Sequence, residues 1–207
     1  MEPHVNEKRI DFSAIHFLKS APSIKECPPD DGREVAFVGR SNAGKSSALN
    51  VIVGSKLART SKLPGRTQLI NYFVADDAHR FVDLPGYGYA EVPEDVKLRW
   101  QKELERYLRE RQSLVGLVLL TDIRRPLQKL DAAMLEWALA SNLPVHILLT
   151  KADKLSRGAS INTLRQLESQ LKNYSGTITS QLFSALKKIG VDEARQQLNH
   201  WLTSEHQ

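Results

Sequence analysis

The sequence has 207 residues, of which 41% are hydrophobic and 26% are charged; this composition indicates an ordinary globular protein and excludes a largely disordered chain. Lys and Arg outnumber Asp and Glu by 29 to 24, and the net charge of +5 favours an anionic partner such as RNA only mildly. No apolar run is long enough to cross a membrane, and the single cysteine, Cys27, cannot form an internal disulfide, so we expect a cytoplasmic protein without a membrane partner.

Residues 1–32 are expected to form an extension that packs on the main domain, which we place at residues 33–207. The extension contains scattered apolar residues followed by a proline-rich stretch, a pattern compatible with one added strand or turn at the edge of a sheet. No internal repeat or long linker divides the rest of the chain. We therefore expect a single domain and a monomer.

Beyond residue 33, short apolar runs alternate with helical patterns, as in an α/β domain with a mostly parallel sheet. We expect six strands, one of them antiparallel because the second and third form a hairpin, with helices on both faces in three layers. The expected strands are residues 35–39, 69–75, 80–84, 115–121, 145–150 and 177–183. The expected helices are residues 45–53, 93–112, 127–141, 161–172 and 192–202.

The second expected helix carries the clearest amphipathic pattern. Its apolar residues recur at three- and four-residue spacings, which places them on one stripe. They are Val96, Trp100, Leu104, Tyr107 and Leu108. We interpret this stripe as part of the core.

The motif GRSNAGKS stands between the first expected strand and the first expected helix. Its Gly39, Gly44, Lys45 and Ser46 match the pattern of a phosphate-binding loop, or P-loop. Such a loop presents backbone N–H groups and a helix N-terminus to an anion, and its glycines let the backbone approach phosphate oxygens closely. We therefore expect Lys45 to reach the β- and γ-phosphates and the Ser46 hydroxyl to bind Mg²⁺.

Octahedral Mg²⁺ needs further oxygen ligands. Asp83 ends a predicted strand in DLPG, where its carboxylate would hold a magnesium-bound water while the Gly86 N–H faces the γ-phosphate. Thr67, in LPGRTQ, is the expected switch threonine because it directly precedes a strand that can anchor it. Thr60 remains the alternative.

The motif TKAD follows the fifth expected strand, at the end where open α/β sheets bind ligands. The Asp153 carboxylate would accept two hydrogen bonds from guanine, whereas adenine presents an acceptor at N1 and would be repelled. The Lys151 stem would lie across the base. The motif FSAL follows the next strand, where the Ala185 N–H would donate to guanine O6. The order of these motifs favours GTP over ATP.

The predicted site combines the P-loop, the segment around Thr67, DLPG, TKAD and FSA. The residues expected to bind GTP are Gly39, Arg40, Ser41, Asn42, Ala43, Gly44, Lys45, Ser46, Gly65, Arg66, Thr67, Gln68, Leu69, Asp83, Leu84, Pro85, Gly86, Thr150, Lys151, Ala152, Asp153, Phe183, Ser184 and Ala185. Those expected to take part in hydrolysis are Lys45, Thr67, Gly86 and Asn42. The expected metal ligands are Ser46, Thr67 and, through water, Asp83.

Five motifs of this chain resemble those of the EngB family of bacterial ribosome-assembly GTPases, in the TrmE–Era–EngA–EngB-like group. They are FLKSAP near the N-terminus, GRSNAGKSS, PGRTQLIN, FVDLPGYGYA and TKADK. The resemblance spans residues 35–202 and implies a Ras-like P-loop GTPase domain that uses Mg²⁺. It also implies a switch in assembly of the large (50S) ribosomal subunit, with rRNA and ribosomal proteins of its precursor as partners, needed for normal cell division and septation. The alternative is a GTP-regulated protein-binding module at the division apparatus, without ribosome contact.

One departure from the Ras pattern bears on the rate of hydrolysis. Ras-type proteins carry a water-orienting glutamine after the glycine of DLPG, whereas this chain has Tyr87, so we expect slow intrinsic hydrolysis. Asn42 stands where related GTPases use an asparagine to help bind potassium, which makes K⁺ a hypothetical second cation. The candidates for rRNA contact are Lys56, Arg59, Lys62, Arg66, Arg124 and Arg125.

Overall fold

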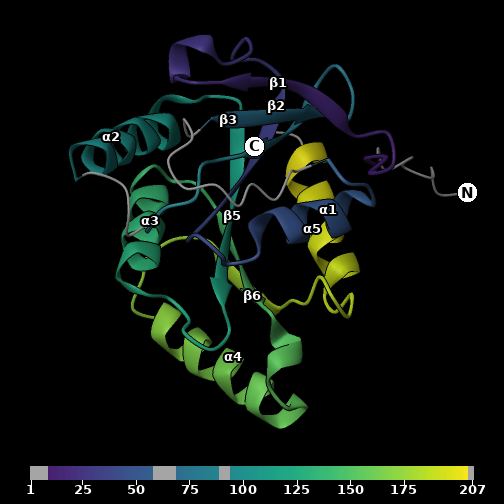
Figure 1. Ribbon diagram of the computed structural model, residues 1–207, viewed down its shortest axis with the longest axis vertical. Coiled ribbons are helices and arrows are strands. Elements are labelled where there is room, and N and C mark those ends of the chain that lie inside the picture. The colour runs from purple at the N-terminus through teal and green to yellow at the C-terminus, as the bar shows by residue number, and fades with distance from the viewer. Residues whose placement is uncertain (1–8, 58–68, 89–93, 205–207) are drawn as a thin grey trace, which may run out of the picture.

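The computed structural model describes residues 9–57, 69–88 and 94–204 (Figure 1). One sheet lies between two layers of helices. Its two faces are covered by different helices: α1 (Lys45–Val53) and α5 (Val191–Thr203) on one, and α2 (Glu94–Glu110), α3 (Lys129–Ala140) and α4 (Arg157–Leu171) on the other. Within the described residues, no helix combines the length and apolar character needed to span a bilayer.

The described part of the sheet has seven strands in the order β1-β3-β4-β2-β5-β6-β7. Their bounds are β1 (His16–Ala21), β2 (Arg33–Gly39), β3 (Ile70–Val74), β4 (His79–Asp83), β5 (Leu114–Asp122), β6 (Val145–Thr150) and β7 (Ile178–Leu182). Strand β3 runs against the others because it pairs antiparallel with both β1 and β4. The carboxyl ends of β2, β4, β5, β6 and β7 therefore meet at one edge of the sheet, where such folds bind ligands.

The predicted α/β class, the three layers and the single antiparallel strand are confirmed, but the predicted number of six strands is too low by one. The additional strand is β1, which adds to the sheet edge beside β3. Most of its side chains are exposed, so it lacks the apolar alternation that identifies a half-buried strand. Its register on β3 also shifts between Phe17 and Lys19.

The expected hairpin is present as β3 and β4, and Asp76 stabilises its turn. The Asp76 Oδ1 atom accepts hydrogen bonds from the N–H groups of Ala78 (2.9 Å) and His79 (3.0 Å). It also lies 2.7 Å from the His79 ring. A short acidic side chain that bonds the backbone two residues on is a common way to hold a turn.

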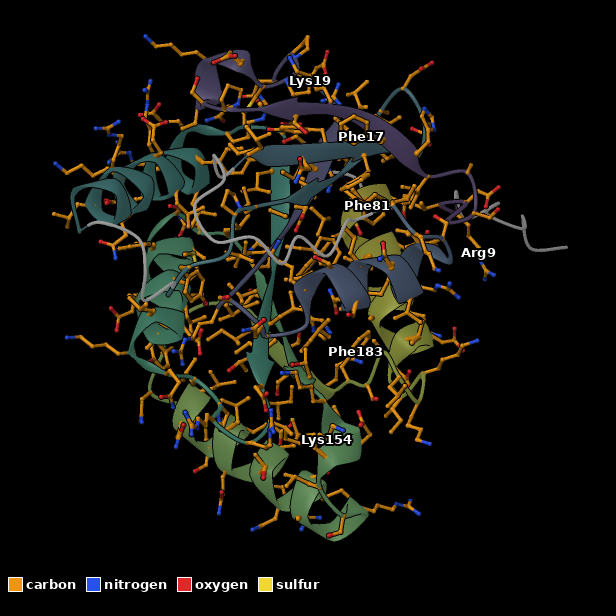
Figure 2. All side chains as sticks on the ribbon, in the orientation of Figure 1. Arg9, Phe17, Lys19, Phe81, Lys154 and Phe183 are labelled. Atoms are coloured by element: carbon orange, nitrogen blue, oxygen red, sulfur yellow. The ribbon has the colours of Figure 1, made fainter. Side chains whose placement is uncertain are left out.

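The two faces of the sheet carry two apolar cores. Phe81 and Phe183 are buried, whereas Lys19 and Lys154 are exposed; all four are labelled in Figure 2. The predicted stripe on α2 faces one of these cores, since Leu104, Tyr107 and Leu108 are buried. The side chains of Val96 and Trp100, also assigned to that stripe, lie outside the described residues.

A buried charged cluster lies at the amino end of β2, away from the edge that carries the motifs. The Glu34 carboxylate has no exposed surface and is bound by Arg111 (2.6 and 2.9 Å), Arg80 (3.2 Å) and the Tyr107 hydroxyl (3.1 Å). The same two arginines also donate to backbone carbonyls of residues 29–31. The cluster thus joins the N-terminal segment to β2, β4 and the end of α2.

Candidate nucleotide site

The loop between β2 and α1 has the shape of an anion cradle. Gly44 stands at the N-cap of α1 with a φ of +91°, a conformation that favours glycine, and no side chain caps the helix there. The first N–H groups of α1 therefore lack intrahelical partners and are available to a ligand. Gly39 is fixed by close packing, because a Cβ at that position would lie 2.7 Å from the Leu120 carbonyl oxygen.

The DLPG segment runs alongside this loop. The Tyr87 N–H donates to the Gly39 carbonyl (3.3 Å), and the Ser41 N–H donates to the Tyr87 carbonyl (2.8 Å). These two hydrogen bonds continue the parallel pairing of β2 and β4 beyond the ends of both strands. Gly86, the last residue of DLPG, is thereby held next to the loop.

Lys45 and Asp83 form an ion pair across the cradle. Both side chains are mostly buried, with exposed fractions of 13% and 10%. The pair places the carboxylate at the end of β4 beside the first turn of α1, which also contains Ser46. Carboxylate and hydroxyl oxygens are ligands that Mg²⁺ prefers. Among the described residues, however, no group of three His, Cys, Asp or Glu side chains could hold a metal alone.

Thr150 and Lys151 of TKAD bind the phosphate loop directly. The buried Thr150 hydroxyl lies 2.6 Å from the Ala43 carbonyl oxygen and 3.1 Å from that of Thr121. The Lys151 ammonium donates to the Asn42 carbonyl at 2.7 Å. The expected base motif and the expected phosphate motif therefore form one structural unit.

TKAD also contacts FSAL. The Ser184 hydroxyl donates to Asp153 Oδ1 at 2.5 Å, and the Ala152 N–H donates to the Phe183 carbonyl at 3.0 Å. The Ser184 backbone is itself fixed by two hydrogen bonds with Ile189. One Asp153 oxygen is thus bound by a residue whose own position is set by the following turn.

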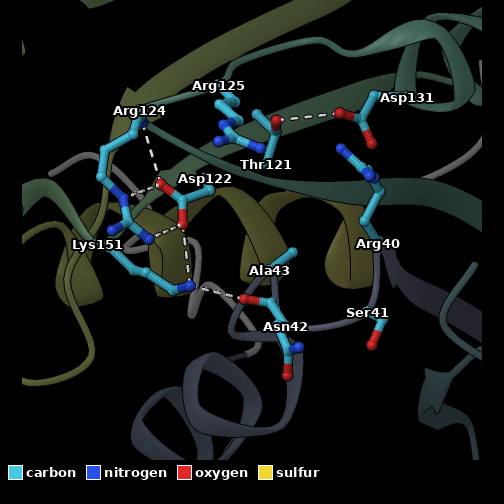
Figure 3. A pocket seen from close by; sticks show the side chains of 10 residues that line it. All are labelled: Arg40, Ser41, Asn42, Ala43, Thr121, Asp122, Arg124, Arg125, Asp131 and Lys151. Atoms are coloured by element: carbon cyan, nitrogen blue, oxygen red, sulfur yellow. Dashed lines mark hydrogen bonds and ion pairs between the residues drawn. The ribbon is translucent and has the colours of Figure 1, made fainter. Parts of the chain in front are cut away.

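A pocket of ≈ 430 Å³ lies on the other side of the phosphate loop, toward β5 and α3 (Figure 3). At its base Asp122 is bound by Arg124 (2.6 and 2.9 Å) and Lys151 (2.9 Å). The hydrogen bond from Arg124, supported by that from Lys151, holds the pKa of Asp122 well below its ordinary value. The residues that line the pocket are Arg40, Ser41, Asn42, Ala43, Thr121, Asp122, Arg124, Arg125, Asp131 and Lys151.

Tyr87 is directed toward α3. Its hydroxyl donates to Asp131 Oδ1 at 2.6 Å, and the other Asp131 oxygen accepts from Thr121 (3.2 Å) and from the Gln128 N–H (2.9 Å). Burial, together with the charge of Asp131, raises the pKa of Tyr87 well above its ordinary value, so the phenol stays protonated and donates. This contact ties the residue after DLPG to the start of α3.

The predicted site residues divide into those that the structure describes and those that it does not. Gly65, Arg66, Thr67 and Gln68 lie outside the described residues, as does the competing Thr60. Leu69 directly precedes β3. The remaining predicted residues gather at the carboxyl edge of the sheet, at the ends of β2, β4 and β6, in the segments that follow β2, β4, β6 and β7, and in the first turn of α1.

The predictions did not include Asp122 or Asp131. Asp122 ends a buried strand at the same edge as Asp83, and this position was the signal available in the sequence. Asp131 stands three residues after Gln128, the spacing of a capping box at the start of α3.

Solved structures with the same fold include GTP-binding proteins. A crystal structure of a probable GTP-binding protein EngB aligns with a TM-score of 0.67 at 20% identity, over 82% of this chain and 98% of that one. The structure of Era in complex with MgGDPNP and a segment of 16S ribosomal RNA aligns with a TM-score of 0.64 at 21% identity, over 86% of this chain and 59% of that one. These likenesses establish a P-loop GTPase fold.

Sequence comparison identifies the family. Residues 34–151 match the family model described as "50S ribosome-binding GTPase". The probable GTP-binding protein EngB of Escherichia coli (strain K12) is 55% identical over 195 residues, which are 94% of this chain and 93% of the relative. With this identity over nearly its whole length, and with the phosphate and base motifs joined at one edge of its sheet, the chain belongs to the EngB family of GTP-binding proteins.

Proposed function

We propose that this protein is a GTP- and Mg²⁺-dependent switch that acts in the cytoplasm in assembly of the large ribosomal subunit and so supports cell division and septation. The observation that carries this proposal is the match of residues 34–151 to a family described as ribosome-binding. In the proposed arrangement, residues 33–207 form the GTP-binding domain, residues 1–32 are its extension, and the monomer alternates between GTP and GDP.

The phosphates would occupy the cradle formed by residues 39–46. Lys45 would exchange its contact with Asp83 for the β- and γ-phosphates, because a bound phosphate group brings more negative charge than one carboxylate. The Asp83 carboxylate, released from that contact, would hold a magnesium-bound water beside the Ser46 hydroxyl. Thr67 is the proposed third ligand from the protein. The bound Mg²⁺ would neutralise charge on the β- and γ-phosphate oxygens.

Guanine recognition is assigned to Asp153, Ala185 and Lys151. The hydrogen bond from Ser184 supports this assignment because it holds the Asp153 carboxylate in one orientation before the base arrives. The half-exposed Ala185 follows Ser184 directly, so its N–H is available to the O6 atom. The Lys151 ammonium donates a hydrogen bond to the Asn42 carbonyl, so the aliphatic part of this side chain extends from the proposed base site to the phosphate loop.

The placement of Tyr87 supports the proposal that intrinsic hydrolysis is slow. A phenol that donates to Asp131 on α3 cannot orient a water for attack on the γ-phosphate as a glutamine amide does. We propose that GTP orders residues 55–67 and 86–91 through the γ-phosphate and the Gly86 N–H, and that hydrolysis releases them.

Potassium is proposed to assist this reaction through Asn42. This residue lies on the phosphate loop with a backbone φ of +64°, and its side chain is exposed. A cation there would supply positive charge that an arginine finger supplies elsewhere. We expect faster GTP turnover in potassium than in sodium buffer at equal ionic strength. Equal rates in the two buffers would rule out this role.

The ribosomal part of the proposal is tested by cosedimentation. Purified protein, loaded with a non-hydrolysable GTP analogue or with GDP, is centrifuged with large-subunit precursor particles. We expect the analogue-loaded protein to cosediment and the GDP-loaded protein to stay in the supernatant. Absence of cosedimentation in both states, with nucleotide-dependent binding to components of the division apparatus, would support the alternative module instead.

A further inference from the structure

The pocket beside the phosphate loop carries more positive charge than its own carboxylates neutralise. Its lining holds four cationic side chains, Arg40, Arg124, Arg125 and Lys151, against two carboxylates, Asp122 and Asp131. The pocket adjoins the proposed nucleotide cradle, because residues 40–43 of the phosphate loop and Lys151 line it. It extends beyond that cradle toward β5 and α3, and its lining does not include Lys45, Asp83 or Asp153.

Both carboxylates of the pocket are already bound. Asp122 is occupied by Arg124 and Lys151. Asp131 accepts from Tyr87 and Thr121, and the nearby charge of Arg40 acts on it without a hydrogen bond. Asp122 is thus shared by two cations, whereas the donors to Asp131 are uncharged and its negative charge is offset only by the nearby Arg40. The four cationic side chains still exceed the two carboxylates by two.

Two guanidinium groups remain. Within the described ranges, neither Arg40 nor Arg125 has a hydrogen-bond or ion-pair partner for its side chain. Both line the pocket and come from different elements, Arg40 from the phosphate loop and Arg125 from the segment after β5 (Figure 3). Planar guanidinium forks match the oxygens of a phosphate group in a bidentate geometry.

We propose that this pocket binds a phosphodiester group of single-stranded RNA, an inference that rests on the proposed ribosomal function. A volume of ≈ 430 Å³ is that of a small-molecule site. It admits one nucleotide unit but excludes a double helix, because proteins bind RNA duplexes across wide, shallow grooves, not inside pockets.

Single-stranded RNA fits these groups better than an acidic peptide does. Its phosphate would lie between Arg40 and Arg125, and its bases could stack on the guanidinium plane of Arg124, whose side chain is 52% exposed. The net charge of +5 also attracts a polyanion over a longer range than a single carboxylate. Because Ser41 and Asn42 line the pocket and belong to the phosphate loop, RNA would lie directly beside the nucleotide site.

The test compares Arg125→Gln and the double variant R124Q/R125Q with Arg109→Gln. Arg109 serves as the control because its side chain is exposed (63%), as those of Arg124 and Arg125 are, but it lies near the opposite end of β5. Like Arg124, and unlike Arg125, it is paired with a neighbouring carboxylate. The full-length protein, loaded with a non-hydrolysable GTP analogue, is titrated against a fluorescent single-stranded RNA of mixed sequence at several salt concentrations.

We expect Arg125→Gln to weaken RNA binding several-fold for all sequences and to lower the slope of log K against log [salt] by about 0.7 for the lost phosphate contact. The double variant should lose more, and Arg109→Gln should behave as wild type. Binding of the GTP analogue and the melting temperature should not change in Arg125→Gln, which shows that the loss is local.

Three results would overturn the inference. The first is equal RNA affinity and equal salt slope for Arg125→Gln and Arg109→Gln, and the second is equal affinity of the wild type for duplex and single-stranded RNA. The third is RNA binding that does not depend on Arg125, together with polyglutamate binding that does. Cosedimentation separates this failure from failure of the proposed function. If Arg125→Gln cosediments fully and binds RNA normally, only the pocket assignment is wrong, whereas wild type that never cosediments contradicts the ribosomal function.

Discussion

The Asp153 carboxylate is oriented by one short hydrogen bond from Ser184 to Oδ1, and its Oδ2 atom lies 3.9 Å from the Lys154 ammonium. Asp153→Asn replaces an acceptor of two guanine donors with an amide that presents one acceptor and one donor. We expect GTP affinity to fall by a factor of roughly 100 or more, since a buried polar group is left mispaired. Xanthine nucleotides, which carry an oxygen in place of the exocyclic amine, should bind the variant better than GTP does.

The matched change at this site is Ser184→Ala. It removes the orienting hydroxyl but keeps the carboxylate, so GTP affinity should fall by a smaller factor and guanine should still be preferred over xanthine. Nucleotide affinities from competition titrations with GTP and XTP distinguish the two variants. Unchanged GTP affinity in Asp153→Asn would remove the base contact from the assignment.

Among single residues, the motifs were predictable and their partners were not. Lys45, Asp83 and Asp153 could be placed at one edge because each follows a predicted strand, and parallel strands bring their carboxyl ends together. The contact of Thr150 with Ala43 joins residues 107 positions apart. No spacing in the sequence indicates such a pair, because the contact depends on how the loops after β2 and β6 pack against each other.

At the scale of elements, helix α5 packs on β5 at a point that only glycine permits. A Cβ on Gly116 would lie 2.3 Å from the buried Trp201 ring. Gly116→Ala should therefore destabilise the protein by about 1 to 3 kcal/mol, the usual cost of overpacking, even though alanine loses less chain entropy than glycine on folding. Urea denaturation of the variant and wild type measures this difference.

Gly158→Ala is the matched control for that prediction. Gly158 lies in α4, and an added Cβ there meets no atom within 4 Å. Alanine has the higher helix propensity, so this change should raise stability by about 0.5 to 1 kcal/mol. If both glycine variants shifted stability in the same direction, packing of α5 on Gly116 would not be the controlling factor.

The boundaries of elements were predictable where apolar periodicity marks them. Helix α1 begins and ends at the predicted residues because a glycine stands on each side of it. Helix α4 begins at Arg157 and not at the predicted residue 161, because Ser156 caps it by accepting from the Ala159 N–H. Its first turn carries few apolar residues, so the pattern of spacing alone could not reveal it.

In the whole molecule, the two ends of the sheet carry different groups of polar residues. The carboxyl edge gathers the nucleotide motifs, and the amino end holds the buried cluster around Glu34. Burial alone would lower the pKa of Arg111, but its hydrogen bonds to Glu34 hold that pKa above the ordinary value. The arginine is therefore charged at any physiological pH, and its charge is matched by a carboxylate that has no exposed surface.

Removing that carboxylate tests how far the cluster supports the whole fold. Glu34→Gln leaves two buried arginines without their shared partner, so we expect a loss of about 3 to 5 kcal/mol in the free energy of unfolding. Glu110→Gln is the control because its pairs with Arg106 and Arg109 are exposed to solvent, which screens them, so this change should leave the stability nearly unchanged. Since the cluster lies at the end of β2 away from the phosphate loop, Glu34→Gln protein that remains folded should bind GTP normally. Equal stability of the two variants would show that the cluster contributes no more than a surface pair.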